Sequence, residues 1–377
     1  MLDPQGVFSQ LLKSVNERKK PKPSQNGYQI HPHHYFDEEI YLRDLKIIKK
    51  FPVLYDRKES FGENTNFRTY DWLTRPLIIC QENSGEFYSF SKICRHRAAS
   101  IVSQECGKAS TFSCPYHGWT YNLKGKVVHI PNKDSFLPSE MNSSVQSFGI
   151  ESCLQGLWVT NDTNETSLKD SLSTLYPELE YASAHYSQLF EYQKEDFAFN
   201  WKAPIDAVLE AYHLPFLHTK TFKPIMENGG IGLHKQVSWH SRNLYPFKRL
   251  RGVIKAINFK DLYQCSSFVY HIFPNTVFSI QPNFAVYFTI FPKGPHSCTI
   301  VTKYLKHPEA DEEKLQEGLT LSKKGLKEDF EILADQAYNL KKSEYDTLVF
   351  CGQEDMIKNF HENLANIAKF EIGDSLI

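Results

Sequence analysis

Two short cysteine–histidine clips constrain this chain more than any other feature. The first reads "CRHR" at residues 94–97, and the second reads "CPYHGW" at residues 114–119. Each clip offers one thiolate and one imidazole, from Cys94 with His96 and from Cys114 with His117. Four such ligands hold either a tetrahedral zinc or a two-iron cluster. Because each clip supplies one cysteine and one histidine, the two cysteines can bind one iron of a [2Fe–2S] centre and the two histidines the other. A zinc site is the alternative.

The sequence around the clips predicts a small antiparallel β domain. Short β-rich runs such as "RPLIICQ" (75–81) and "GLWVTN" (156–161) are separated by Gly, Asn and Ser, which places both clips on loops. Because 377 residues exceed one ordinary core, a second domain is expected. We expect the β domain over 46–162, a second domain over 163–377, and an N-terminal segment, 1–45, packed on the second domain. Within that segment we expect a helix over 7–20 and a linker, "KKPKPSQNG", over 19–27.

A second motif, "NWKAPIDAVLEAYHLPFLH" at 200–218, carries two histidines and a carboxylate. A helix is predicted over 204–214, starting at Pro204. Glu210 and His213 are three residues apart and are expected on one helix face, with Pro215 ending the helix before His218. Two imidazoles and one carboxylate form a ferrous site that leaves positions open for dioxygen. The alternative is that both histidines are ordinary polar residues near a helix end.

Both motifs together resemble a known family. The stretch "CRHR…CPYHGWTYNLKGKVVHIP", with its Gly125 turn and Ile130-Pro131, resembles the Rieske domain of Rieske non-haem iron oxygenases, and 200–218 resembles the catalytic-domain signature. The resemblance implies a catalytic (alpha) subunit of the ring-hydroxylating or quaternary-amine type. It implies an α+β fold, in which a β Rieske domain joins a helix-grip domain, an antiparallel sheet around a long helix. It assigns the four clip residues to a Rieske [2Fe–2S] cluster and His213 and His218 to mononuclear Fe(II). Glu210 becomes the bridge to a cluster histidine of a neighbouring subunit.

The third iron ligand must come from the C-terminal part. Family members place it as "ED" followed by apolar residues and a glutamine, a register that "EDFEILADQ" at 328–336 reproduces. We therefore predict Asp329, on a helix over 311–340, with Asp355 at the start of a last helix (352–369) as the alternative. Asp206 is either a residue near the pocket or a solvated carboxylate. The substrate pocket is expected to be lined by Leu209, Phe222, Met226, Ile231 and Phe273.

The resemblance implies a terminal oxygenase component that oxidises a small organic molecule with O2. Hydroxylation, dihydroxylation and oxidative demethylation or cleavage all use the same metals. Since the chain has no Gly-x-Gly-x-x-Gly motif, NAD(P)H must be oxidised by a separate reductase. Its electrons would reach this chain directly or through a ferredoxin. The resemblance also implies electron transfer between the subunits of a head-to-tail homotrimer, a normal closed assembly. The alternatives are a non-catalytic Rieske electron carrier and a zinc-ribbon scaffold protein.

Composition excludes several partners. A formal charge of −1 argues against nucleic acid as a partner. The sequence contains no apolar run of 18 or more residues, so no membrane span is predicted. The N-terminal stretch lacks the apolar core of a secretory signal, and eight scattered cysteines do not suggest a disulfide scaffold. We therefore expect a cytoplasmic protein.

Overall fold

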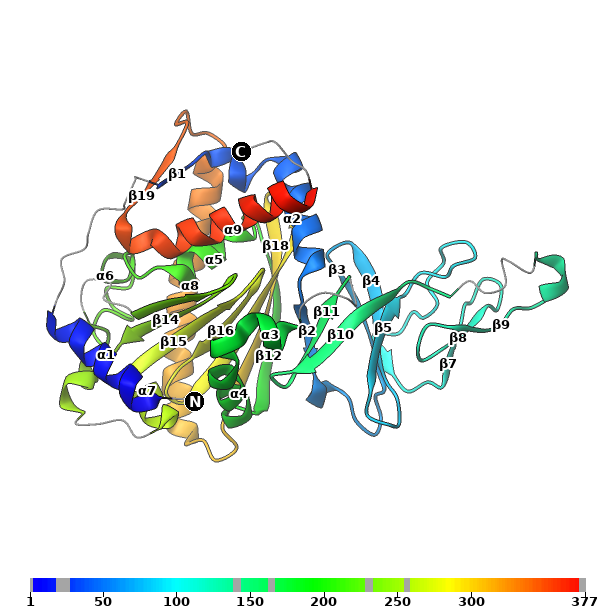
Figure 1. The fold of residues 1–377 in the computed structure, drawn as a ribbon, viewed down its shortest axis with the longest axis horizontal. Coiled ribbons are helices and arrows are strands. Elements are labelled where there is room, and N and C mark those ends of the chain that lie inside the picture. The colour runs from blue at the N-terminus through cyan, green and yellow to red at the C-terminus, as the bar shows by residue number, and fades with distance from the viewer. Residues whose placement is uncertain are drawn as a thin grey trace. The chain divides into compact units, whose positions relative to one another are not determined.

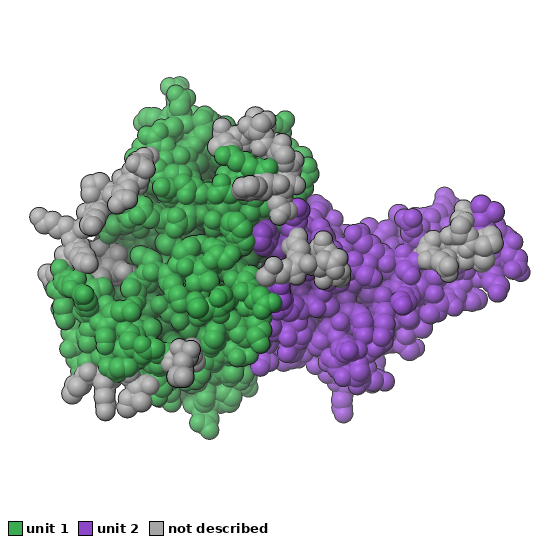
Figure 2. Space-filling view, in the orientation of Figure 1, with its two compact units in different colours: residues 1–48, 169–377 green, residues 49–168 purple. Residues whose placement is uncertain are grey.

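The chain divides into two compact units, coloured separately in Figure 2. Unit 2 comprises residues 49–168, and unit 1 comprises residues 1–48 together with 169–377. The computed structural model describes residues 3–17, 28–137, 144–161, 167–227, 233–253 and 258–372, so the linker expected at 19–27 lies outside the described residues. No described helix combines the length and the apolar character that crossing a bilayer requires.

Unit 2 consists of two antiparallel sheets, as its alternating β-rich runs predict. Its core gathers aromatic rings such as Phe67, Phe90 and Phe112 with both clip cysteines. The larger sheet has the order β2-β11-β10-β5-β4-β3-β6, and the smaller has the order β7-β8-β9. The strands are β2 (Val53–Arg57), β3 (Phe67–Trp72), β4 (Arg75–Gln81), β5 (Phe87–Ser91), β6 (Cys106–Gly107), β7 (Thr111–Ser113), β8 (Thr120–Asn122), β9 (Val127–His129), β10 (Ser147–Cys153) and β11 (Gly156–Thr160).

Unit 1 is built on a seven-stranded antiparallel sheet of order β12-β18-β17-β16-β15-β14-β13 (Figure 1). A long helix, α8, packs against β17, which gives the predicted helix-grip arrangement. A small pair, β1 (Tyr28–Ile30) with β19 (Leu348–Phe350), lies apart from this sheet. The strands of the large sheet are β12 (Gln188–Phe197), β13 (Leu233–Val237), β14 (His240–Pro246), β15 (Ser266–Ile272), β16 (Thr276–Ile280), β17 (Phe284–Gly294) and β18 (Ser297–Lys306). The helices are α1 (Pro4–Glu17), α2 (Glu38–Lys50), α3 (Leu168–Leu172), α4 (Tyr176–His185), α5 (Lys202–Leu209), α6 (Leu214–Leu217), α7 (Phe259–Cys265), α8 (Glu312–Leu340) and α9 (Asp355–Ile372).

Helix α8 forms over nearly the predicted range because its first turn is capped. The Asp311 carboxylate accepts the backbone N–H groups of Glu313 and Lys314, each at 3.2 Å. Farther along, a Cβ added at Gly325 would lie only 2.2 Å from the Phe222 ring. The glycine therefore lets this ring lie directly on the helix.

The single helix predicted over 204–214 is wrong. Helix α5 ends at Leu209, and Glu210 adopts an extended conformation with φ −131° and ψ 167°. His213 then precedes the short helix α6, and Pro215 lies in the first turn of that helix. A proline inside a continuous helix would remove one hydrogen bond and clash with the preceding turn, whereas a first turn tolerates it. Consequently His213 and His218 bracket α6, and Glu210 reaches His213 from an extended segment.

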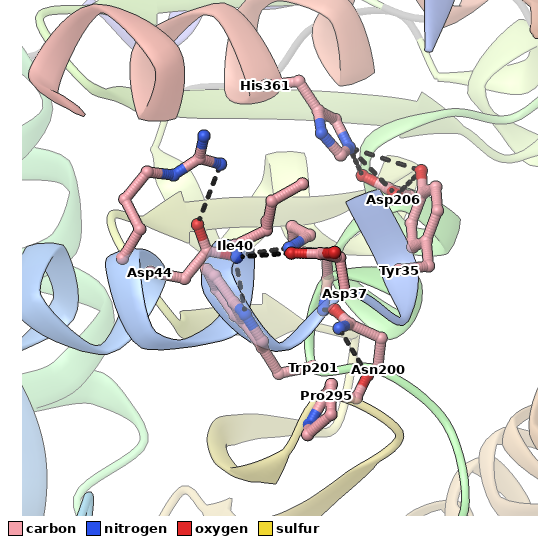
Figure 3. Close-up of polar contacts among 11 residues, drawn as sticks. Tyr35, Asp37, Ile40, Asp44, Asn200, Trp201, Asp206, Pro295 and His361 are labelled. Atoms are coloured by element: carbon pink, nitrogen blue, oxygen red, sulfur yellow. Dashed lines mark hydrogen bonds and ion pairs between the residues drawn. The ribbon is translucent and has the colours of Figure 1, made fainter. Parts of the chain in front are cut away.

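Buried polar contacts hold α5 in place (Figure 3). The Asp44 carboxylate of α2 accepts a hydrogen bond from the ammonium of Lys202, and both side chains are almost fully buried. One turn on, Asp206 accepts the Tyr35 hydroxyl at 2.7 Å and lies 3.1 Å from Nε2 of His361 on α9. Asp206 is 8% exposed, so it is not a solvated carboxylate. It ties the start of the metal-site segment to the N-terminal segment and to α9.

Candidate metal centres

The two clips of unit 2 form loops of the same construction. In the first, the Ala98 N–H donates to the Cys94 carbonyl at 3.0 Å, and in the second the Gly118 N–H donates to the Cys114 carbonyl at 2.9 Å. Ala98 and Gly118 both have positive φ, +59° and +72°. Each cysteine thus begins a tight turn that brings its following histidine back toward the opposite loop.

The loops bring the two predicted imidazoles together and place both cysteines in one buried core. The cysteines are 2% and 3% exposed, and the rings of His96 and His117 have centroids 4.6 Å apart. Nδ1 of His96 is buried and has no hydrogen-bond partner among the described residues. The Tyr121 hydroxyl lies 3.2 Å from Sγ of Cys94. Two thiols, two imidazoles and an unpaired buried ring nitrogen are a donor set that fits a [2Fe–2S] centre with mixed ligands.

A second centre lies in unit 1, where His213, His218 and Asp329 meet. One ligand atom from each lies within 4.8 Å of the others. Oδ1 of Asp329 is 2.9 Å from Nε2 of His218 and 3.6 Å from Nε2 of His213. Asp355, the alternative, is the exposed first residue of α9 and is absent from this group.

A carboxylate holds the outer nitrogen of each histidine. Glu210 contacts Nδ1 of His213, and Glu328 lies 2.8 Å from Nδ1 of His218. These contacts place a proton on Nδ1, so that both Nε2 atoms face Asp329 as bases. Nε2 of the fully buried His218 lies 2.9 Å from Oδ1 of Asp329 and points into the ligand group. Two imidazole nitrogens that converge on one carboxylate are a donor set that fits a ferrous ion.

Charge around His218 outweighs its burial. Burial alone would lower the pKa of this imidazole, but the hydrogen bonds and negative charges of Asp329 and Glu328 raise the pKa above its usual value. Glu328 responds in the opposite sense. Burial favours its neutral form, yet hydrogen bonds from Thr221 and His218 lower the pKa of the carboxyl. The site therefore favours positive charge near its centre, as a bound divalent cation supplies.

Glu328 was missed as a functional residue by sequence reasoning. Besides His218, its Oε2 accepts the Thr221 hydroxyl at 2.7 Å. Its place directly before Asp329 was visible, but an "ED" pair does not reveal which histidine the glutamate meets. That contact depends on how α8 lies against the turn after α6.

A cavity of about 830 Å³ adjoins this centre, and Glu210, His213, His218 and Asp329 form part of its wall. Of the predicted pocket residues, Phe222 and Met226 line it. Leu209 and Phe273 do not; both are buried core residues, and the Phe273 ring packs toward His271 and Phe360 of α9. Ile231 lies outside the described residues. Apolar character in the sequence could not distinguish core from cavity wall.

Comparison with known families accounts for both centres. Residues 179–369 match the family described as "Ring hydroxylating alpha subunit (catalytic domain)", and residues 51–149 match the "Rieske [2Fe-2S] domain". The first match alone covers half of the chain. The chain is a ring-hydroxylating Rieske oxygenase alpha subunit by family.

Among curated members of this family, the anthranilate 1,2-dioxygenase large subunit of Acinetobacter baylyi is 26% identical over 52% of this chain and 44% of its own length. The alpha subunit of 2-aminobenzenesulfonate 2,3-dioxygenase from Alcaligenes sp. matches over 60% of its length. The chain thus spans less than two thirds of these relatives. A longer match, 24% identical over 95% of this chain and 88% of the relative, is to the chloroplastic choline monooxygenase of Arabidopsis thaliana.

Solved structures of the family share the fold. The naphthalene 1,2-dioxygenase of Rhodococcus sp. bound to indole superposes with a TM-score of 0.76 at 16% identity, over 97% of this chain and 99% of that one. A quaternary ammonium Rieske monooxygenase linked to carnitine oxidation by gut microbiota gives 0.75 at 17% identity, over 90% and 94%. At these identities the likeness is one of architecture.

Proposed function

We propose that this chain is the terminal oxygenase component of a Rieske system, which oxidises a small organic substrate with O2 and electrons from a separate reductase. One observation carries the proposal. His213 and His218 each have Nδ1 held by a carboxylate, and both turn Nε2 toward Oδ1 of Asp329 at the wall of a large cavity. Two imidazoles and one carboxylate are the residues that would hold a ferrous ion of the kind that binds dioxygen.

Five residues of the chain would bind the iron or orient its ligands. His213, His218 and Asp329 would hold the Fe(II), which when bound supplies the capacity to bind and activate O2. Glu210 and Glu328 keep the imidazoles oriented and their Nδ1 atoms protonated. The Phe222 ring, whose centroid is 4.7 Å from that of His218, packs beside this imidazole and lines the cavity.

Cys94, Cys114, His96 and His117 would hold the Rieske cluster, which stores one electron at a time. We propose that Glu210 also contacts a cluster histidine of a neighbouring subunit, in a head-to-tail homotrimer. The placement of its carboxylate on His213 supports this role, since one short chain of hydrogen bonds would then join the two centres. NAD(P)H would act only through the partner reductase, with or without a ferredoxin.

The names of relatives include anthranilate, choline and naphthalene oxygenases, and so they cover both ring oxidation and attack on amines. Because hydroxylation, dihydroxylation and oxidative demethylation or cleavage use the same metals, we propose the reaction class and a small organic substrate.

Metal analysis of the anaerobically purified protein tests the proposal. We expect about three irons and two sulfides per chain, with a Rieske-type EPR signal after reduction by dithionite. Asp329→Ala should lose one iron, whereas Asp355→Ala, at an exposed helix start, should lose none. Two irons in the unaltered protein would favour the electron carrier, and zinc without iron would favour the scaffold.

Glu210→Gln tests the bridging role. The amide keeps the size of the side chain but lacks the charge, so with iron in excess both metal centres should stay loaded while reduction of the mononuclear site slows by at least about tenfold. Single-turnover oxidation of the reduced cluster by O2 measures this rate. An unchanged rate with full metal content would remove Glu210 from the electron path.

A further inference from the structure

We propose that the cavity binds an elongated, uncharged substrate with an apolar body and a hydroxyl group at the end remote from His213, His218 and Asp329. This inference rests on the proposed function, because the metal-ligand group defines the end at which oxidation occurs. The polar end is formed by Ser267, Ser279 and Gln281, for which sequence analysis gave no role.

The cavity is long because it follows helix α8. Its wall includes Asp329 at one end and Gly318 and Lys314 toward the start of the helix. About three helical turns, or roughly 16 Å, separate Gly318 from Asp329. The start of β17 faces the same early turns, since a Cβ on Gly318 would lie 3.1 Å from the Phe284 ring and the Asn283 amide donates to the Lys314 carbonyl at 3.2 Å.

The middle of the cavity is apolar. Val269, Val277 and Val286 project from β15, β16 and β17, and Leu321 and Leu326 project from α8. The register pairs Val269 with Ser279 and Ser279 with Val286, so Ser279 lies beside both valines, where the apolar stretch meets the polar end. A substrate that fills this stretch gains from burying apolar surface.

Ser267 near the start of β15, Ser279 near the end of β16 and Gln281 just after β16 form a small hydrogen-bonding group. Nε2 of Gln281 donates to Oγ of Ser267 at 2.7 Å and to Oγ of Ser279 at 3.0 Å. Both amide hydrogens are thereby used, while each serine keeps its own hydrogen for donation. Oε1 of Gln281 accepts from no described residue. The group therefore offers two hydroxyl donors beside one amide acceptor, and a ligand hydroxyl, which both donates and accepts, complements it.

The charged residues of the wall near this end are all exposed: Lys248, Arg249, Lys314 and Glu317. Nζ of the exposed Lys314 lies 3.3 Å from Asp311, and Nζ of Lys248 donates to the Lys223 and Pro224 carbonyls at 2.9 and 3.0 Å. The Arg249 guanidinium lies over the Phe247 ring. A carboxylate or a quaternary ammonium placed beside Gln281 would therefore lose its hydration without gaining a buried counter-charge. A neutral hydroxyl does not carry that cost.

Calorimetric titration of the iron-loaded protein under anaerobic conditions tests the inference. The probes are 1-decanol, decanoate and decyltrimethylammonium, which share one chain and differ in the end group. We expect 1-decanol to bind at least about tenfold more tightly than either ion. Gln281→Leu should weaken 1-decanol binding by about tenfold, and Ser279→Ala by several-fold. Neither substitution should weaken the binding of decanoate or decyltrimethylammonium to the same extent. Gln193→Leu, a glutamine of β12 outside the cavity wall, should change nothing.

Equal binding of the three probes, or tighter binding of either ion, would overturn the hydroxyl site. So would 1-decanol binding that both Gln281→Leu and Ser279→Ala leave unchanged. Should Gln281→Leu unfold, as its circular dichroism would reveal, Ser279→Ala alone decides. Iron counted in the same samples separates the two proposals. Absence of the mononuclear iron would contradict the oxygenase function, whereas full iron with no alcohol preference would contradict the hydroxyl site alone.

Discussion

At the residue scale, Glu328 is the side chain whose role is easiest to test apart from the ligands themselves. Its carboxylate holds Nδ1 of His218 at 2.8 Å and accepts the Thr221 hydroxyl at 2.7 Å. In Glu328→Gln the amide removes the negative charge that orients the imidazole and makes it a stronger base. Such contacts behind a ligand typically change metal affinity by 10–100-fold, so we expect mononuclear iron to be lost to a chelator at about tenfold lower concentration.

Glu331→Gln is the matched control, because Glu331 is an exposed glutamate on the same helix and lies 3.9 Å from Lys327, away from the ligand group. Cluster iron should remain in both variants. Equal iron retention by Glu328→Gln and the unaltered protein would mean that the ligands hold the metal without this support.

At the element scale, the neighbouring strands β14 and β15 carry two buried neutral histidines. Burial, followed by the nearby His271, lowers the pKa of His240 to about 3. Burial also lowers the pKa of His271 to about 4, although its bond to the Pro274 carbonyl and the charge of Asp206 act in the other direction. Both stay neutral in the folded protein, while in the unfolded chain they take up protons near their usual 6.5.

Folding stability should therefore fall as the pH falls below about 6.5, by up to about 1.4 kcal/mol per pH unit for each histidine. Urea unfolding at pH 7.5 and 5.5 measures this slope. His240→Gln cannot titrate and should flatten it. A slope that is identical in His240→Gln would assign the acid sensitivity to other groups.

The elements also show what sequence could and could not predict. Within unit 2 the histidines of the two clips lie close together, and within unit 1 His213, His218 and Asp329 do, because residue spacing and family pattern describe short segments whose local conformation is restricted. That these groups bind metals stays a prediction. The break after Leu209 was missed because Pro215 fits the first turn of a new helix as well as it ends an old one. Phe273 and Leu209 were misplaced because the rotation of an element about its axis depends on tertiary packing.

At the scale of the whole molecule, unit 2 is inserted into unit 1. Its first strand, β2, pairs antiparallel with its last, β11, with Val53 opposite Val159. The two ends of unit 2 thus lie side by side. By contrast, unit 1 needs both of its parts, since β1 pairs with β19 and Lys202 of α5 contacts Asp44 of α2.

We therefore predict that residues 49–168, expressed alone, fold and hold the cluster. All strands that pair with one another in this unit belong to the fragment, and so do both clips and the core around Phe112. The fragment should melt cooperatively and give a Rieske-type EPR signal with about two irons. Cys114→Ser should abolish that signal, and Cys106→Ser, at an exposed position outside the clips, should preserve it. A fragment that remains unfolded when supplied with iron and sulfide would show that unit 2 needs unit 1 to reach its native state.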